Sequence, residues 1–172
     1  MDFTASKYYL KLREGIIMEF ENTIRKIIEE ECEDYYLGIA DLSSAENDIL
    51  KQYESFFDEY PRAISIGITL PYTDTAEVIV RSNKVYNETN QQLNAITVSL
   101  SKLLQQKGYK TLSIPKTEKV DDNNFISLHK LAANVANLGE IEKNGLLVTP
   151  EVGSGVNWGT ILTDAPIEAA SQ

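Results

Sequence analysis

The sequence predicts a single domain of the layered α/β class, more closely an α+β fold in which helices pack against a central, mixed sheet. The chain has 172 residues, a length that suits one domain with a continuous core. Hydrophobic residues make up 42% of the chain and charged residues 24%, which is typical of a folded globular protein. Helical and strand-like hydrophobic patterns alternate without an internal repeat or a flexible linker, so residues 1–172 are predicted to fold together.

Hydrophobic spacing in the first half predicts two helices and two strands. Apolar residues recur at helical spacing from Lys7 to Cys32, so one amphipathic helix dominates residues 1–34. Ser43 and Glu46 form a capping-box pattern that opens a second helix. The predicted elements, in order, are helix 7–32, strand 35–40, helix 43–57 and strand 63–70. The last is a β-branched run between two prolines, which is expected to be covered on both faces.

The second half continues the alternation. Apolar residues keep a helical period up to Lys107, and Gly108 supplies a helix-ending glycine. A short strand ended by Pro115 leads into a polar loop that contains Asp121 and Asp122. The predicted elements, in order, are a helix over 93–107 whose start could lie as early as Glu77, strand 112–114, loop 116–124, helix 128–138 ended by Gly139, and strands 146–149 and 156–163.

Charge and cysteine content argue against several kinds of partner and site. The chain has 16 Lys and Arg against 26 Asp and Glu, a net charge of −10, and such a surface repels phosphate backbones and anionic lipids. We therefore expect no nucleic-acid partner and no membrane association. Cys32 is the single cysteine, which excludes an internal disulfide and leaves too few thiolates for a zinc or iron–sulfur site. A reducing, cytoplasmic location and no metal site are expected.

Three side chains are weak candidates for acid–base chemistry, and no catalytic residue is assigned. His129, the single histidine, could transfer a proton or contact a ligand, although a partly exposed helix residue is the simpler interpretation. Asp122 could supply a carboxylic acid, although adjacent acids in a polar loop are usually solvated. Tyr86 could donate a proton in a reduction, or be a buried tyrosine with an ordinary hydrogen-bond partner.

The C-terminal third carries a motif that resembles a known family. The segments are Ser127–Ala133, Ala136–Gly139, Lys143–Glu151 with Gly153, and Ile161–Pro166. They resemble the epoxyqueuosine reductase and reductive dehalogenase family, in the form of its archaeal members. Upstream pieces follow in the family's order, so the likeness covers most of residues 35–167.

The resemblance implies a nitroreductase-like fold that holds cobalamin near the glycine-rich C-terminal strands. By position, the residues that match the motif around the cofactor are Lys143, Asn144, Thr149, Pro150, Gly153 and Thr163. In the family, a ferredoxin-like segment with cysteine-ligated 4Fe–4S clusters follows this domain and passes electrons to cobalt. The 172 residues hold no ligands for such clusters, so the resemblance implies either a separate electron donor such as a ferredoxin or a ferredoxin segment that is missing from this sequence.

Several positions depart from the family pattern. Asn137 replaces a glycine, Glu140 replaces an aromatic residue, and Glu142 replaces the glycine before Lys143. Glu140 and Glu142 thus add two carboxylates to a motif that, in the family, surrounds the amide and phosphate groups of the cofactor. Because these carboxylates raise the costs of desolvation and repulsion, we expect a lower affinity for cobalamin. The family's catalytic aspartate falls on Asn123, one residue from Asp122.

Three functional hypotheses follow. The first is a corrinoid-binding redox domain, inactive alone, that needs an external electron donor or an iron–sulfur segment. The second keeps the fold but exchanges the cofactor, because nitroreductase-like proteins hold FMN, usually across a homodimer, and perform flavin-dependent reductions. The third is a degenerate, non-catalytic binding module.

Overall fold

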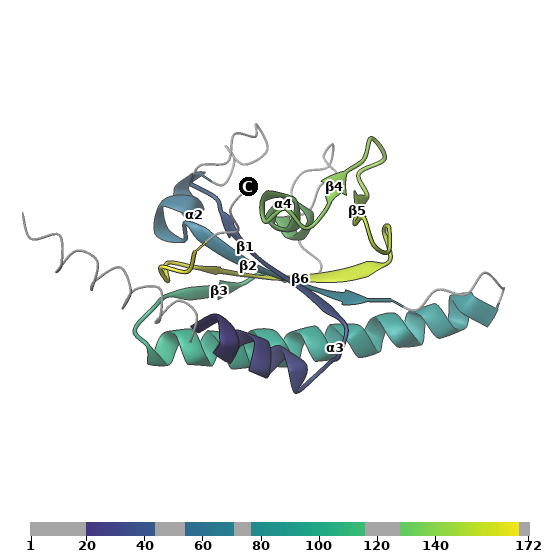
Figure 1. The fold of residues 1–172 in the computed structure, drawn as a ribbon, viewed down its shortest axis with the longest axis horizontal. Coiled ribbons are helices and arrows are strands. Elements are labelled where there is room, and N and C mark those ends of the chain that lie inside the picture. The colour runs from purple at the N-terminus through teal and green to yellow at the C-terminus, as the bar shows by residue number, and fades with distance from the viewer. Residues whose placement is uncertain (1–19, 44–53, 71–76, 116–127, 169–172) are drawn as a thin grey trace, which may run out of the picture.

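The chain forms a four-stranded sheet covered by helices on both faces (Figure 1). The computed structural model describes residues 20–43, 54–70, 77–115 and 128–168. In the order of the sheet, the strands are β1 (Tyr35–Asp41), β2 (Arg62–Thr69), β6 (Val156–Thr163) and β3 (Thr111–Ser113). These layers confirm the predicted fold class.

The sheet is antiparallel, and the expectation of a mixed sheet is wrong for the described strands. All three neighbouring pairs run in opposite directions. Helix α3 (Glu77–Gln106) connects β2 to β3, and these two strands do run parallel, as a helical crossover predicts. They are not neighbours, however, because β6 inserts between them and runs opposite to both.

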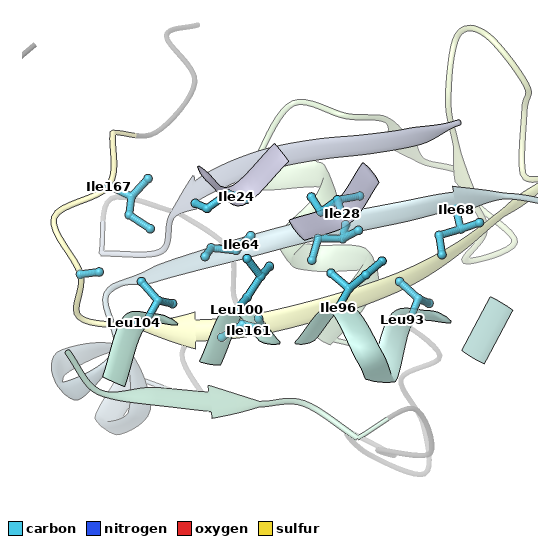
Figure 2. Close-up of a cluster of buried hydrophobic side chains, with 12 residues drawn as sticks. Ile24, Ile28, Ile64, Ile68, Leu93, Ile96, Leu100, Leu104, Ile161 and Ile167 are labelled. Carbon is cyan, nitrogen blue, oxygen red and sulfur yellow. The ribbon is translucent and has the colours of Figure 1, made fainter. Parts of the chain in front are cut away.

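One face of the sheet packs on α3 and on the helical residues 20–29, which lie side by side (Figure 1). Figure 2 shows how isoleucine and leucine side chains from these helices meet those of β2 and β6. The fully or almost fully buried members are Ile24, Ile28, Ile64, Ile66, Ile68, Leu93, Ile96, Leu100, Leu104 and Ile161. Helical spacing in α3 and alternate positions in β2 therefore supply the main core, as the sequence predicts.

The opposite face packs on three smaller elements. They are α4 (Leu128–Val135), α2 (Glu54–Glu59) and a hairpin of β4 (Glu140–Ile141) and β5 (Leu147–Val148). Helix α4 approaches β1 closely, since a Cβ atom on Gly38 would lie 2.9 Å from Ala136 Cβ. The two helices predicted at 7–32 and 43–57 fall partly outside the described residues, and α2 extends beyond the predicted end at Phe57.

Helix α4 ends at Val135 and is capped by Asn137, not by Gly139, which corrects the predicted boundary. Asn137 has a positive φ of 65°, the left-handed conformation of a helix C-cap. Its N–H donates to Asn134 O at 2.9 Å, and Leu138 N–H donates to Ala133 O at 3.0 Å. Gly139 serves close packing instead, because a Cβ atom there would lie 2.7 Å from Val148 O. Helix α3 ends at Gln106, and Gly108, with φ 91°, follows it as the predicted helix-ending glycine.

Candidate functional site

The tip of the β4–β5 hairpin presents two of the residues expected to contact a cofactor, Lys143 and Asn144. Gly145 N–H donates to Glu142 O at 2.9 Å, and Glu142 N–H donates to Leu146 O at 2.9 Å. Gly145 has a φ of 81°, a conformation that glycine adopts without strain, so the three-residue loop closes tightly. Lys143 and Asn144 are consequently exposed.

Two polar side chains of α4 hold this hairpin in place. Lys130 Nζ donates to Gly145 O at 2.9 Å, and Asn134 Nδ2 donates to Gly139 O at 2.9 Å. Neither residue is among the cofactor contacts expected from the sequence. Their spacing of four on α4 is a signal for a shared helix face, but nothing in the sequence indicates that the hairpin folds back onto that face.

A second turn, Thr149 to Gly153, leads from the hairpin into β6. Thr149 N–H donates to Gly153 O at 2.8 Å, and Gly153 N–H donates to Thr149 O at 3.0 Å. The Thr149 hydroxyl donates to Gly153 O and accepts from Val152 N–H, so this buried side chain is engaged within the turn. Pro150 is exposed, and open space lies where a Cβ atom on Gly153 would be. A ligand can therefore approach this turn at Pro150 and Gly153.

Aromatic residues of the sheet support the second turn from below. Tyr36 O–H donates to Glu151 Oε2 at 3.1 Å. The Tyr36 ring packs against Trp158, with 5.8 Å between ring centroids. These contacts fix the turn over β1 and β6, and they direct the Glu151 carboxylate toward Tyr36.

Thr163 lies at the far end of β6, away from the other expected cofactor contacts. Seven residue steps separate it from Val156, which is about 23 Å at the rise of a β-strand. Thr163 is fully buried, and its hydroxyl donates to Lys110 O at 2.7 Å and accepts from Ala165 N–H at 3.1 Å. The structure thus brings five of the six expected residues to one end of the domain and places Thr163 in a structural network at the other.

The three acid–base candidates lie apart from this end or outside the described residues. His129 is buried, with 4% of its surface exposed, so the simpler interpretation as a partly exposed residue is wrong. Its Nδ1 lies 2.8 Å from Thr160 Oγ1 and its Nε2 lies 2.9 Å from Pro115 O. Tyr86 is 42% exposed on α3, across the sheet from the hairpin, so it is not a buried tyrosine. Asp122 lies outside the described residues.

Two small pockets flank the end of β3, away from the hairpin. The larger, about 170 Å³, lies between α3 and β6, and uncharged side chains line it, including Asn90, Asn94 and Thr97. Asn157 fixes one wall, because its Nδ2 donates to Asn90 Oδ1 at 2.8 Å. The smaller pocket, about 140 Å³, is mostly apolar and includes Phe56. Within the described ranges, no group of three or more His, Cys, Asp or Glu side chains could hold a metal ion.

Comparison with solved structures shows what this fold resembles. An epoxyqueuosine reductase solved with a tRNA-Tyr epoxyqueuosine-modified stem loop superposes with a TM-score of 0.59 at 14% identity, over 90% of this chain and 48% of that one. The Streptococcus thermophilus enzyme gives 0.56 at 15% identity, over 88% and 48%. The Bacillus subtilis enzyme, with its catalytic loop swung out of the active site, gives 0.58 at 13%, over 90% and 47%. No protein-family model and no curated protein sequence matches.

These likenesses establish the fold, and the chain spans about half the length of the enzymes that it matches. The resemblance to epoxyqueuosine reductase is thereby confirmed at the level of the fold. The expectation of no nucleic-acid partner is corrected, since a protein that shares this fold was solved with a tRNA stem loop. Net charge alone was a poor basis for excluding nucleic acid, because binding depends on the local charge of one surface. None of the helices in the described part is long and apolar enough to span a membrane.

Proposed function

We propose that this chain is a cobalamin-binding domain of a redox protein, and that it uses the hairpin tip and the following turn to hold the cofactor. The observation that carries the proposal is the superposition on epoxyqueuosine reductases over 90% of the chain. The motif Lys143–Glu151 with Gly153 supports it, since these residues lie together at one end of the domain.

The residues at this end suit a large polar cofactor. Lys143 and Asn144 are exposed donors that can bind phosphate and amide oxygens. The backbone at Pro150 and Gly153 is open to close approach, since no atom outside Gly153 and its two chain neighbours lies within 4 Å of where a Gly153 Cβ would be. Thr149 would act indirectly, by closing the turn that presents these groups. When bound, cobalamin would supply a cobalt centre that accepts and passes on electrons.

The carboxylates of the motif oppose this binding. Glu140 and Glu142 are exposed on the same hairpin as Lys143, so they leave the hairpin with a net negative charge. A carboxylate near a phosphate group raises the free energy of the complex. We therefore propose weaker cobalamin binding than in a chain with the family's glycine and aromatic residue at these positions.

An electron donor is part of the proposal. The matched enzymes are about twice as long as this chain, and the single cysteine, Cys32, cannot ligate an iron–sulfur cluster alone. A separate donor such as a ferredoxin, or an iron–sulfur segment outside this sequence, would reduce the cofactor. We also propose a location in the reducing cytoplasm, because a single cysteine cannot form an internal disulfide.

Titration with hydroxocobalamin, followed by absorbance and calorimetry, tests the proposal. Saturable one-to-one binding is expected, and Lys143→Ala and Asn144→Ala should weaken it by roughly tenfold each, as loss of a charge-assisted or neutral hydrogen bond implies. Lys102→Ala and Asn87→Ala, on exposed positions of α3, are the matched controls. Glu142→Gln should strengthen binding by a few fold, because it removes a repelling charge.

Other outcomes of the titration are equally informative. Binding of FMN instead of cobalamin would favour a flavin-dependent reductase. Failure to bind either cofactor would leave a non-catalytic module. A tRNA stem loop belongs in the same set of ligands, because a protein with this fold was solved with one.

A further inference from the structure

The hairpin tip carries the single Asn–Gly pair of the sequence, Asn144–Gly145. The geometry points to Asn144 as a site of spontaneous modification, at which water converts the asparagine into aspartate or isoaspartate. The modification needs an exposed asparagine whose side chain lies over the next peptide nitrogen, and it needs a following residue that does not obstruct ring closure.

The side chain of Asn144 is exposed and folded back along its own turn. Its Oδ1 accepts a hydrogen bond from Leu146 N–H at 3.1 Å. This Asx turn spans Gly145 and keeps the Asn144 amide beside the Gly145 peptide. The hydrogen bond also polarises the amide carbonyl, which makes Cγ more electrophilic.

The reaction balances without any reagent except water. The Gly145 nitrogen forms a bond to Asn144 Cγ, the Cγ–Nδ2 bond breaks, and ammonia leaves with the proton of the Gly145 amide. The product is a five-membered cyclic imide. Water then opens this imide at one of its two carbonyls. Attack at the side-chain carbonyl gives aspartate, whereas attack at the main-chain carbonyl gives isoaspartate, in which the peptide bond to Gly145 runs through the side-chain carbonyl.

The surrounding backbone permits ring closure. Gly145 has no Cβ atom to obstruct the attack, and its φ of 81° lies in a region that glycine readily leaves. Two contacts of Gly145 compete with ring closure, namely the hydrogen bond from its N–H to Glu142 O and the one that its carbonyl oxygen accepts from Lys130 Nζ. Both lie at the tip of a hairpin whose strands have two residues each, and such a short ladder opens locally at low cost.

Asn87 provides an internal comparison. It is also exposed, but it lies inside α3 and is followed by Glu88. Helical hydrogen bonding holds the backbone on both sides, and the Glu88 side chain crowds the attacking nitrogen. Asn87 is expected to persist while Asn144 is consumed.

Modification would change the charge of the hairpin tip. A new carboxylate would lie between Lys143 and Gly145, and isoaspartate would also add a backbone carbon to the loop. If the tip binds cobalamin as proposed above, the new charge should lower the affinity for cobalamin further; this consequence rests on the proposed function. The chemical change itself does not depend on cobalamin.

The experiment is to age the purified full-length protein at mildly alkaline pH and physiological temperature and to map its peptides by mass spectrometry. Isoaspartate is measured in parallel by enzymatic methylation of its free α-carboxylate. We expect Asn144 to convert at least roughly ten times faster than Asn87, because only Asn144 precedes a residue without a Cβ atom. Asn144→Gln should abolish the methylated peptide, since a glutamine would have to close a larger ring.

The urea-unfolded chain is the positive control for the chemistry. If it converts at Asn144 while the folded protein does so no faster than at Asn87, the turn protects Asn144 and the inference is wrong. Cobalamin titration of the aged protein is a separate readout. A loss of cobalamin affinity in the aged protein tests the proposed function, whereas the mass change of the Asn144 peptide tests the modification by itself.

Discussion

His129 Nε2 lies 2.9 Å from the carbonyl oxygen of Pro115, so a histidine at the start of α4 is hydrogen-bonded to the end of the segment that follows β3. A carbonyl only accepts, which places the proton on Nε2. In the neutral ring, Nδ1 then accepts from the Thr160 hydroxyl at 2.8 Å. His129 thus joins three segments that are distant in sequence, on the face of the sheet that α4 covers.

His129→Ala should therefore destabilise the fold by about 2 to 3 kcal/mol, because it leaves a buried hydroxyl and a carbonyl without this partner and creates a cavity. Urea unfolding measures the change. His129→Gln should lose less, since a glutamine amide can still donate toward Pro115 O. In a cycle with Thr160→Val, the two substitutions should not be additive. Additive costs would show that the hydrogen bond contributes nothing.

Asn137→Gly should stabilise the protein by up to about 1 kcal/mol, because Asn137 has a φ of 65° at the C-cap of α4 and glycine adopts that conformation with less strain. Asn137→Ala should destabilise it by a similar amount. Asn87→Ala, within α3, is the matched control and should raise stability slightly through helix propensity. Thermal unfolding of the three variants measures these changes in stability. A glycine variant that is less stable than the unsubstituted protein would contradict the prediction.

This residue also shows what could be predicted from the sequence. The family pattern has a glycine where Asn137 stands, and the structure explains the exchange, since asparagine is the residue that best replaces glycine in the left-handed region. Periodicity correctly predicted α3 and β2, because both bury a regular pattern in one large core.

Long-range placement could not be predicted in the same way. The insertion of β6 between β2 and β3 depends on pairing between strands that are far apart in sequence, which local spacing does not encode. Thr163 matches the family motif, yet its hydroxyl contacts Lys110 O and Ala165 N–H, partners that no motif indicates. The hairpin tip was predicted better because a three-residue turn is a local feature.

Gly67→Ala should destabilise the sheet by about 2 to 3 kcal/mol through overpacking. Gly67 pairs with Tyr36 on one side and Trp158 on the other, and a Cβ atom on it would lie 2.6 Å from both the Trp158 ring and Val156 Cγ1. Fluorescence of Trp158, the single tryptophan, reports the displacement as a red shift. Combining the substitution with Trp158→Leu should reduce the cost, since one of the two clashes is then removed. An undiminished cost in the double variant would assign the effect to the contact with Val156 instead.

Cys32 should react slowly with alkylating reagents in the folded protein. Burial raises the pKa of the Cys32 thiol, and the charges of Glu31 and Asp34 raise it further. The thiol also lies 3.7 Å from Ile28 O, to which it donates. Because the thiolate is the nucleophile, iodoacetamide at neutral pH should modify Cys32 roughly tenfold more slowly than in the urea-unfolded chain.

The same pKa shift sets the direction of a pH dependence. The folded state favours the neutral thiol, so this contribution to stability is present below the pKa of the unfolded thiol and is lost as the pH rises through the higher pKa of the folded one. The alkylation rate of the folded protein should rise over that alkaline range. Cys32→Ser supplies the unreactive control. Equal rates in the folded and unfolded chains would contradict a partly buried, protonated thiol beside acidic residues.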